Sequence, residues 1–79
     1  MTEQEIFEGL KEVFREIKPK MDLDKVNMES GLINDLGMDS LSMLLVSLAS
    51  EEKFKMQFEL QRPFSTVRDV VSYIKKQTD

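Results

Sequence analysis

The sequence predicts a small all-α protein, a three- to four-helix bundle with a long loop between its first and second helices. Three observations support this prediction. Apolar residues recur at helical spacing near both ends of the chain, helix-starting residues precede three segments, and neither Gly nor Pro interrupts residues 40–61. A chain of 79 residues has the size of one domain, so we expect a single domain over residues 1–79.

The first helix is predicted over residues 3–18. Thr2 and Glu5 have the spacing of a capping box at its start. Pro19 ends it, because the residue before a proline is pushed out of the helical conformation. Its apolar residues follow spacings of one, three and four and so share one face: Ile6, Phe7, Leu10, Val13, Phe14 and Ile17.

Residues 19–38 are predicted to form a long loop, because they contain Pro19, Gly31, Asn34 and Gly37. A loop of this length in a compact domain is expected only where it is functional or packs its own side chains. Apolar residues are spaced along it: Met21, Leu23, Val26, Met28, Leu32, Ile33 and Leu36. Their spacing indicates that the loop lies across a core.

The second helix is predicted over residues 40–54, with Asp39 as its N-cap. The next segment, residues 55–64, is ambiguous and is compatible with a short helical turn before Pro63.

The last helix is predicted over residues 66–77. Thr66 and Asp69 have capping spacing at its start, ahead of apolar residues at helical spacing. Lys75 and Lys76 stand near its end, where the helix dipole favours cations.

Composition excludes several classes of function. The chain has no cysteine and no histidine, which removes disulfides, thiolate metal sites, cysteine nucleophiles and the commonest general base. We therefore expect no enzyme and no metal site. The net charge of −4 argues against nucleic-acid binding and favours basic partners. No signal peptide and no run of about 20 apolar residues is present, so we expect a monomeric cytoplasmic protein without membrane insertion.

One local arrangement is a candidate functional site. The run from Gly31 to Leu41 places Ser40 in the first turn of a helix, directly after a glycine-containing loop. An ordinary helix start explains Asp39-Ser40 equally well when these residues are taken alone. A hydroxyl at this position is exposed beside unpaired backbone N–H groups, which favours an attached phosphodiester. Without a base of its own, Ser40 needs a partner enzyme to activate it.

The motif resembles that of the acyl carrier protein family, which reads D-L-G-x-D-S-L. Asp35-Leu36-Gly37-Met38-Asp39-Ser40-Leu41 matches it in full, and Glu51-Glu52-Lys53-Phe54 matches the usual end of the family's second helix. The resemblance covers nearly the whole chain, up to a last helix that begins after Ser65-Thr66-Val67.

The resemblance implies that a phosphopantetheinyl transferase attaches 4′-phosphopantetheine to Ser40 and recognises Asp39. The arm's thiol then holds acyl groups as thioesters for acyl-transferring and chain-elongating enzymes of fatty-acid or polyketide-type synthesis, and a helical bundle can shelter the acyl chain between its helices. Neither the acyl group nor the pathway follows from the sequence, although the second helix tilts the interpretation toward a specialised pathway.

The second helix departs from the family's pattern. Ser42 and Leu45 stand where typical members have acidic residues two and five positions after the serine, and the helix is unusually apolar. Two explanations are open: a shifted core face with ordinary burial, or a hydrophobic docking surface for a dedicated partner. The candidate docking residues are Asp35, Leu41, Met43, Leu45 and Leu48.

Two alternatives to an acyl carrier remain. One is an aminoacyl or peptidyl carrier, a related class that usually has G-G-x-S, whereas this chain has Leu36 before its single Gly37. The other is an unmodified helical interaction domain, in which Ser40 is an ordinary helix-start residue.

Overall fold

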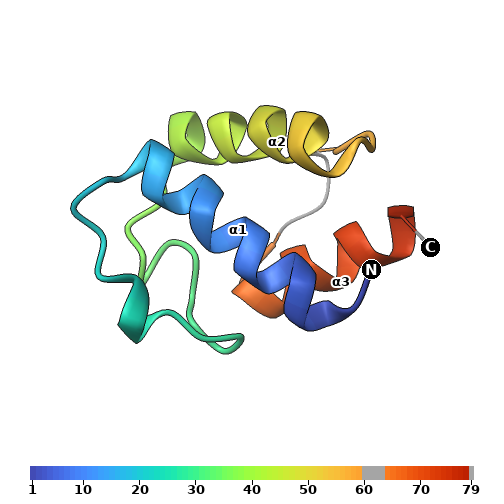
Figure 1. The fold of residues 1–79 in the computed structure, drawn as a ribbon. Helices are drawn as coiled ribbons and strands as arrows, with labels where there is room; N and C mark the ends of the chain where they lie inside the picture. Colours follow the sequence, from blue (N-terminus) through green and yellow to red (C-terminus); the bar gives the residue numbers. More distant parts are fainter. Residues whose placement is uncertain (60–63, 79) are drawn as a thin grey trace.

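The computed structural model describes residues 1–59 and 64–78, which are all-helical apart from one isolated β-bridge. The substantial helices are α1 (Glu3–Ile17), α2 (Ser40–Phe54) and α3 (Val67–Thr78). A short 3-10 helix, η1 (Leu23–Lys25), interrupts the connection between α1 and α2. Figure 1 shows α2 crossing above α1, α3 below it, and the long connection extending to one side. The predicted all-α class and long loop are confirmed.

The start of α1 has the predicted capping box. The Glu5 backbone N–H donates to Thr2 Oγ1 at 3.1 Å, and the Thr2 N–H donates to Glu5 Oε1 at 2.8 Å. The helix ends at Ile17, one residue before the predicted end. Lys18 has left the helical conformation ahead of Pro19, although its N–H still donates to the Phe14 carbonyl at 2.7 Å.

The start of α3 lies at Val67, one residue after the predicted position, because Thr66 caps the helix. The Thr66 N–H donates to Asp69 Oδ2 at 3.1 Å, and the Asp69 N–H donates to Thr66 Oγ1 at 3.4 Å. At the end of α2, Lys55 takes the left-handed conformation. Residues 55–59 are not helical, and the rest of the predicted turn before Pro63 lies outside the described residues.

The long connection crosses the core, as predicted. Val26, Leu32 and Met38 are buried in it, whereas Ile33 is exposed. The connection is also tied to the start of α3 by a bridge between Gly31 and Thr66. The bonds on either side of the bridge run from the Leu32 N–H to the Ser65 carbonyl at 2.9 Å and from the Val67 N–H to the Ser30 carbonyl at 3.0 Å. These bonds position the segment that leads into Ser40.

The helices meet through α1, which packs against both α2 and α3. Gly9 allows a close approach, because a Cβ added there would lie 2.9 Å from the Phe54 ring of α2. An exposed ion pair joins the same two helices, with Lys53 Nζ 2.7 Å from Glu12 Oε2. None of the described helices combines the length and apolar character that crossing a membrane requires.

Candidate functional site

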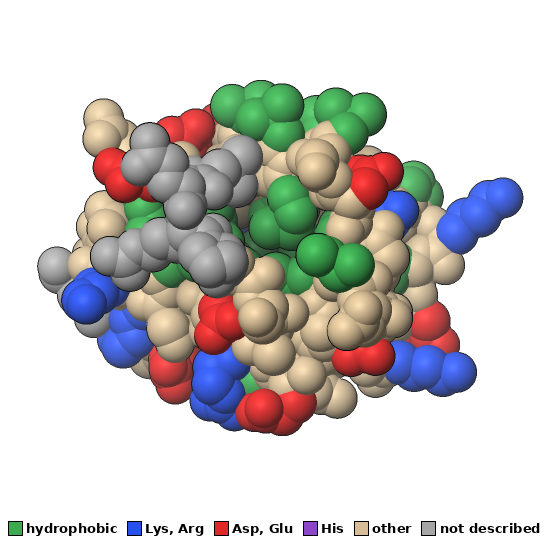
Figure 2. Space-filling view, turned by 180° about the vertical axis from the view of Figure 1, so that it is seen from behind, with side chains coloured by type: hydrophobic (Ala, Val, Ile, Leu, Met, Phe, Trp, Pro, Cys, Tyr) green, Lys and Arg blue, Asp and Glu red, His purple; other side chains and the backbone are tan. Residues whose placement is uncertain are grey.

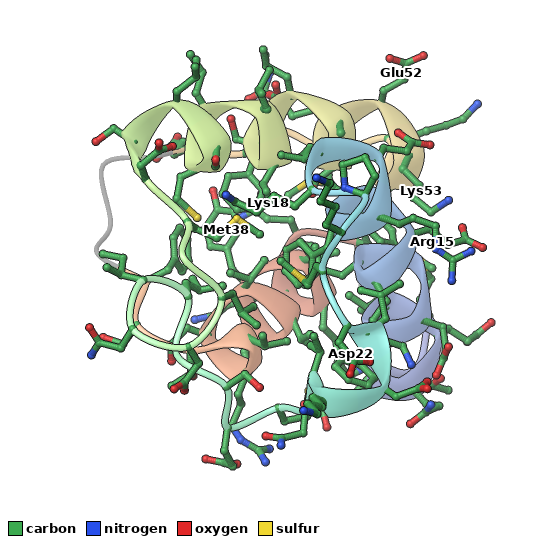
Figure 3. The ribbon with its side chains drawn as sticks, turned by 90° about the vertical axis from the view of Figure 1, so that its left-hand side faces the viewer. Arg15, Lys18, Asp22, Met38, Glu52 and Lys53 are labelled. Carbon is green, nitrogen blue, oxygen red and sulfur yellow. The ribbon has the colours of Figure 1, made fainter. Side chains whose placement is uncertain are left out.

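The loop before Ser40 is held by its own hydrogen bonds. Asp35 Oδ2 accepts from the Gly31 N–H at 2.6 Å, and the Met38 N–H donates to the Leu32 carbonyl at 2.9 Å. Gly37 has a φ of 67°, a left-handed conformation that most side chains disfavour. The loop then places Met38 in the core, at 1% exposure, and Figure 3 shows this side chain pointing into the interior below α2. The chain therefore enters α2 from a buried anchor.

Ser40 is the first residue of α2, and its side chain is exposed. Asp39 caps the helix, since its Oδ1 accepts from the Ser42 N–H at 2.8 Å and its carbonyl accepts from the Met43 N–H at 2.9 Å. Among the described residues, the N–H groups of Ser40 and Leu41 have no acceptor. An exposed hydroxyl beside free N–H groups at a helix N-terminus fits an attached phosphodiester.

Hydrogen bonding keeps Asp39 ionised. The backbone N–H of Ser42, and next its hydroxyl, lower the pKa of the Asp39 carboxyl, and the charge of Lys18 lowers it further. A carboxylate at this position also interacts favourably with the positive end of the helix dipole. The site therefore presents a fixed negative charge directly beside the Ser40 hydroxyl.

The leucines of α2 face outward. Leu41, Leu44, Leu45 and Leu48 are 64, 43, 42 and 54% exposed. Figure 2 shows apolar side chains gathered along the top of the molecule, where α2 runs. We call these four residues the leucine row. The apolar run of α2 is therefore not explained by ordinary burial in a shifted core face.

The other candidate docking residues lie apart from the leucine row. Met43 is half-buried and packs against the core. Asp35 is exposed, but its carboxylate also holds the loop through Gly31. Leu44 belongs to the row and was absent from the sequence-based set, although its place one turn from Leu41 and Leu48 is a signal that could have found it.

The buried face of α2 carries serines in place of leucines. Its buried residues are Ser42, Val46, Ser47, Ser50 and Phe54. The hydroxyl of Ser47 donates to the Leu44 carbonyl at 2.7 Å, whereas Ser50 Oγ has no hydrogen-bond partner within the part of the chain that the structure describes. Hydropathy alone could not assign these serines to the core.

A cleft of about 890 Å³ lies beside the site. Its described lining comes entirely from residues 18–36 and includes Met21, Val26 and Leu36 together with Lys18 and Lys25. The cleft therefore belongs to the long connection and is separate from the space between α1, α2 and α3. The described residues hold no cluster of three or more His, Cys, Asp or Glu side chains that could bind a metal ion.

Comparison with known proteins identifies the family. No family model matches the chain. The acyl carrier protein of Clostridium perfringens is 40% identical over 76 residues, covering 94% of this chain and 99% of that protein. The acyl carrier protein of Thermobifida fusca is 35% identical over 77 residues, covering 95% of this chain and 96% of its own.

A specialised relative aligns over the same region. The meromycolate extension acyl carrier protein of Mycolicibacterium smegmatis is 36% identical over 77 residues, covering 95% of this chain and 77% of that protein. Identity at this level over nearly the whole chain, together with the attachment motif and the capped serine at the start of α2, shows that the chain belongs to the acyl carrier protein family.

Proposed function

We propose that this chain carries acyl intermediates as thioesters on a 4′-phosphopantetheine arm attached to Ser40. It is a carrier in fatty-acid or related biosynthesis. The observation that supports Ser40 as the attachment residue is its exposed hydroxyl in the first turn of α2, beside a capping carboxylate and free N–H groups. When attached, the arm would supply the thiol that forms the thioester.

The attachment step requires a phosphopantetheinyl transferase. Ser40 Oγ forms a bond to the phosphorus of the phosphopantetheine half of coenzyme A, and the pyrophosphate bond breaks with release of adenosine bisphosphate. The hydroxyl proton passes to a base on the transferase, because this chain has no histidine and Asp39 is held as a capping carboxylate. Asp39 serves recognition by the transferase through its fixed negative charge.

The chain itself performs no catalysis in this proposal. It acts as a monomeric, cytoplasmic, single carrier domain over residues 1–79 and delivers its cargo to acyl-transferring and chain-elongating enzymes. Its acidic net charge of −4 favours partners with basic docking surfaces.

Intact mass tests the attachment. The apo protein is incubated with coenzyme A, Mg²⁺ and a broad-specificity phosphopantetheinyl transferase. We expect a gain of one phosphopantetheine in the wild type and none in Ser40→Ala. Ser65→Ala is the matched control, because Ser65 is also exposed and also precedes a helix with a capping aspartate. No gain in the wild type with several transferases would support an unmodified interaction domain instead.

Asp39→Asn tests the recognition role separately. Asparagine is as good an N-cap as aspartate, so the helix start is retained while the charge is removed. We expect slower arm transfer with little change in thermal stability. Equal transfer rates for the two proteins would remove Asp39 from the recognition role.

We propose further that partner enzymes dock on the leucine row, with Leu41, Leu45 and Leu48 from the sequence-based set and Leu44 in addition. Exposed apolar surface of this kind marks interaction sites on soluble proteins. Met43 and Asp35 stay candidates at its edge.

A charge placed in the row tests this docking surface. Leu45→Glu is expected to reduce turnover by an acyl-transferring partner while the protein stays folded, because Leu45 is largely in solvent. Ser72→Glu, at an exposed position of α3, is the control. Unchanged partner turnover and stability in Leu45→Glu would contradict docking here.

A further inference from the structure

The interior of this bundle is polar at a position where a bundle of this size normally buries an aliphatic side chain. Ser50 is 0% exposed and lies on the same face of α2 as Val46 and Phe54, one turn away on either side. A hydroxyl without a partner costs stability when it is removed from water. Ser50 therefore needs an explanation beyond folding.

The usual local explanation does not apply to Ser50. A serine within a helix commonly satisfies its hydroxyl on the carbonyl three or four residues earlier, and Ser47 does so with Leu44. Ser50 has no such bond among the described residues, so its donor and its acceptor sites are unused in the core. Native proteins reserve such groups for bound molecules or ordered water.

The position of Ser50 relates it to the attachment point. Ser40 and Ser50 are on the same helix, ten residues apart, which corresponds to roughly 15 Å along its axis. Ser42 and Ser47 add polar groups to the same buried face between these two positions. A chain that starts at Ser40 and enters the bundle would pass along this serine face.

The core can open for such a chain. Met38 is buried in it, and Met43 and Met56 pack against it. Methionine is unbranched and has three rotatable bonds, so these side chains can rearrange around a guest more readily than β-branched ones.

We infer that the serine face of α2 accommodates an acyl chain that bears a hydroxyl group, with Ser50 Oγ as its hydrogen-bond partner inside the bundle. This inference rests on the proposed function, since the chain must be attached through Ser40. It assigns a substrate class, hydroxylated acyl chains, and names Ser50 as the residue that distinguishes them from plain hydrocarbon chains.

Thermal unfolding of loaded proteins tests the inference. Wild type, Ser50→Ala and the exposed control Ser72→Ala are loaded with an octanoyl chain, or with octanoyl chains hydroxylated at the third or the terminal carbon. Intact mass first verifies each loading. In wild type and Ser72→Ala, at least one hydroxylated chain is expected to raise the unfolding midpoint roughly 4 to 8 °C more than octanoyl does, the size expected for one net hydrogen bond in a domain of this length.

In Ser50→Ala this extra stabilisation is expected to disappear while octanoyl acts as before. Alanine is a better helix former than serine, so the variant is expected to fold. Hydroxylated chains that stabilise the wild type no more than octanoyl does, or an advantage that survives in Ser50→Ala, would overturn the inference and leave the proposed function intact. Failure to load any arm on the wild type would overturn both.

Discussion

α1 and α2 are both 15 residues long, yet they divide their apolar residues between core and solvent in opposite ways. α1 buries Ile6, Leu10, Val13 and Phe14 and exposes charged residues, as expected of a helix whose pattern serves folding alone. α2 exposes four leucines and buries three serines.

This contrast separates stability from function. Exposing leucine forgoes the favourable burial of apolar surface, and burying an unpartnered hydroxyl adds a cost. Departures from local consistency of this kind concentrate at functional sites. α1 is therefore the helix that stabilises the bundle, and α2 is the helix whose two faces we assign to partners and cargo.

The largest expected effect comes from truncating α1. Phe14→Ala should lower the free energy of unfolding by about 3 to 5 kcal/mol, because Phe14 is fully buried and its loss leaves a cavity. Denaturation by urea measures this change. A loss below about 1 kcal/mol would show that α1 does not carry the stability that the comparison assigns to it.

Truncating the buried face of α2 should have the opposite sign. Ser50→Ala is expected to raise the free energy of unfolding of the unloaded protein by about 1 kcal/mol, since it removes a buried hydroxyl without a partner. The same urea titration applies, and Ser47→Ala is the comparison because its hydroxyl is hydrogen-bonded. A clear loss of stability in Ser50→Ala would indicate that its hydroxyl is satisfied in the folded protein.

The helix caps should respond alike in α1 and α2. Thr2→Ala and Asp39→Ala should each cost about 1 kcal/mol at neutral pH, because each removes a side-chain acceptor of a backbone N–H. Asp39→Asn should retain most of that stability. Thermal unfolding of the four proteins, wild type included, checks this, and a cost confined to one helix would contradict it.

Acid should weaken both helix starts. The Thr2 backbone N–H, and next its side chain, lower the pKa of Glu5, while Ser42 lowers that of Asp39. A lowered folded-state pKa stabilises the protein above the unfolded-state value, about 4, and this contribution is lost as the pH falls through the folded-state value. Stability should therefore decline below about pH 4, less steeply in Asp39→Asn. Identical acid profiles for wild type and Asp39→Asn would show that Asp39 makes no such contribution.

The smallest effect on stability is expected on the leucine row. Leu48→Gln should change the free energy of unfolding by less than about 0.5 kcal/mol, because the side chain is already more than half exposed. A loss comparable to that of Phe14→Ala would mean that Leu48 packs against the core and is unavailable to partners.

Local signals predicted much of the fold and the attachment site. The capping box of Thr2 and Glu5, the break at Pro19 and the cap at Asp39 act over a few residues, so the bounds of α1 and α2 followed from the sequence almost to the residue. The motif around Ser40 likewise predicted an exposed hydroxyl at a helix start. The path of the connection did not follow, because its bridge joins Gly31 to Thr66, far away in the sequence.

The sequence by itself determined the all-α class, the helix starts and the family motif, because these depend on spacing and on neighbouring side chains. Only the tertiary structure decided which face of α2 is buried. Apolar residues occur all around this helix, so their period does not select a face. The contacts of α2 with the rest of the bundle make that choice, and they turn the leucines to solvent and Ser50 into the core.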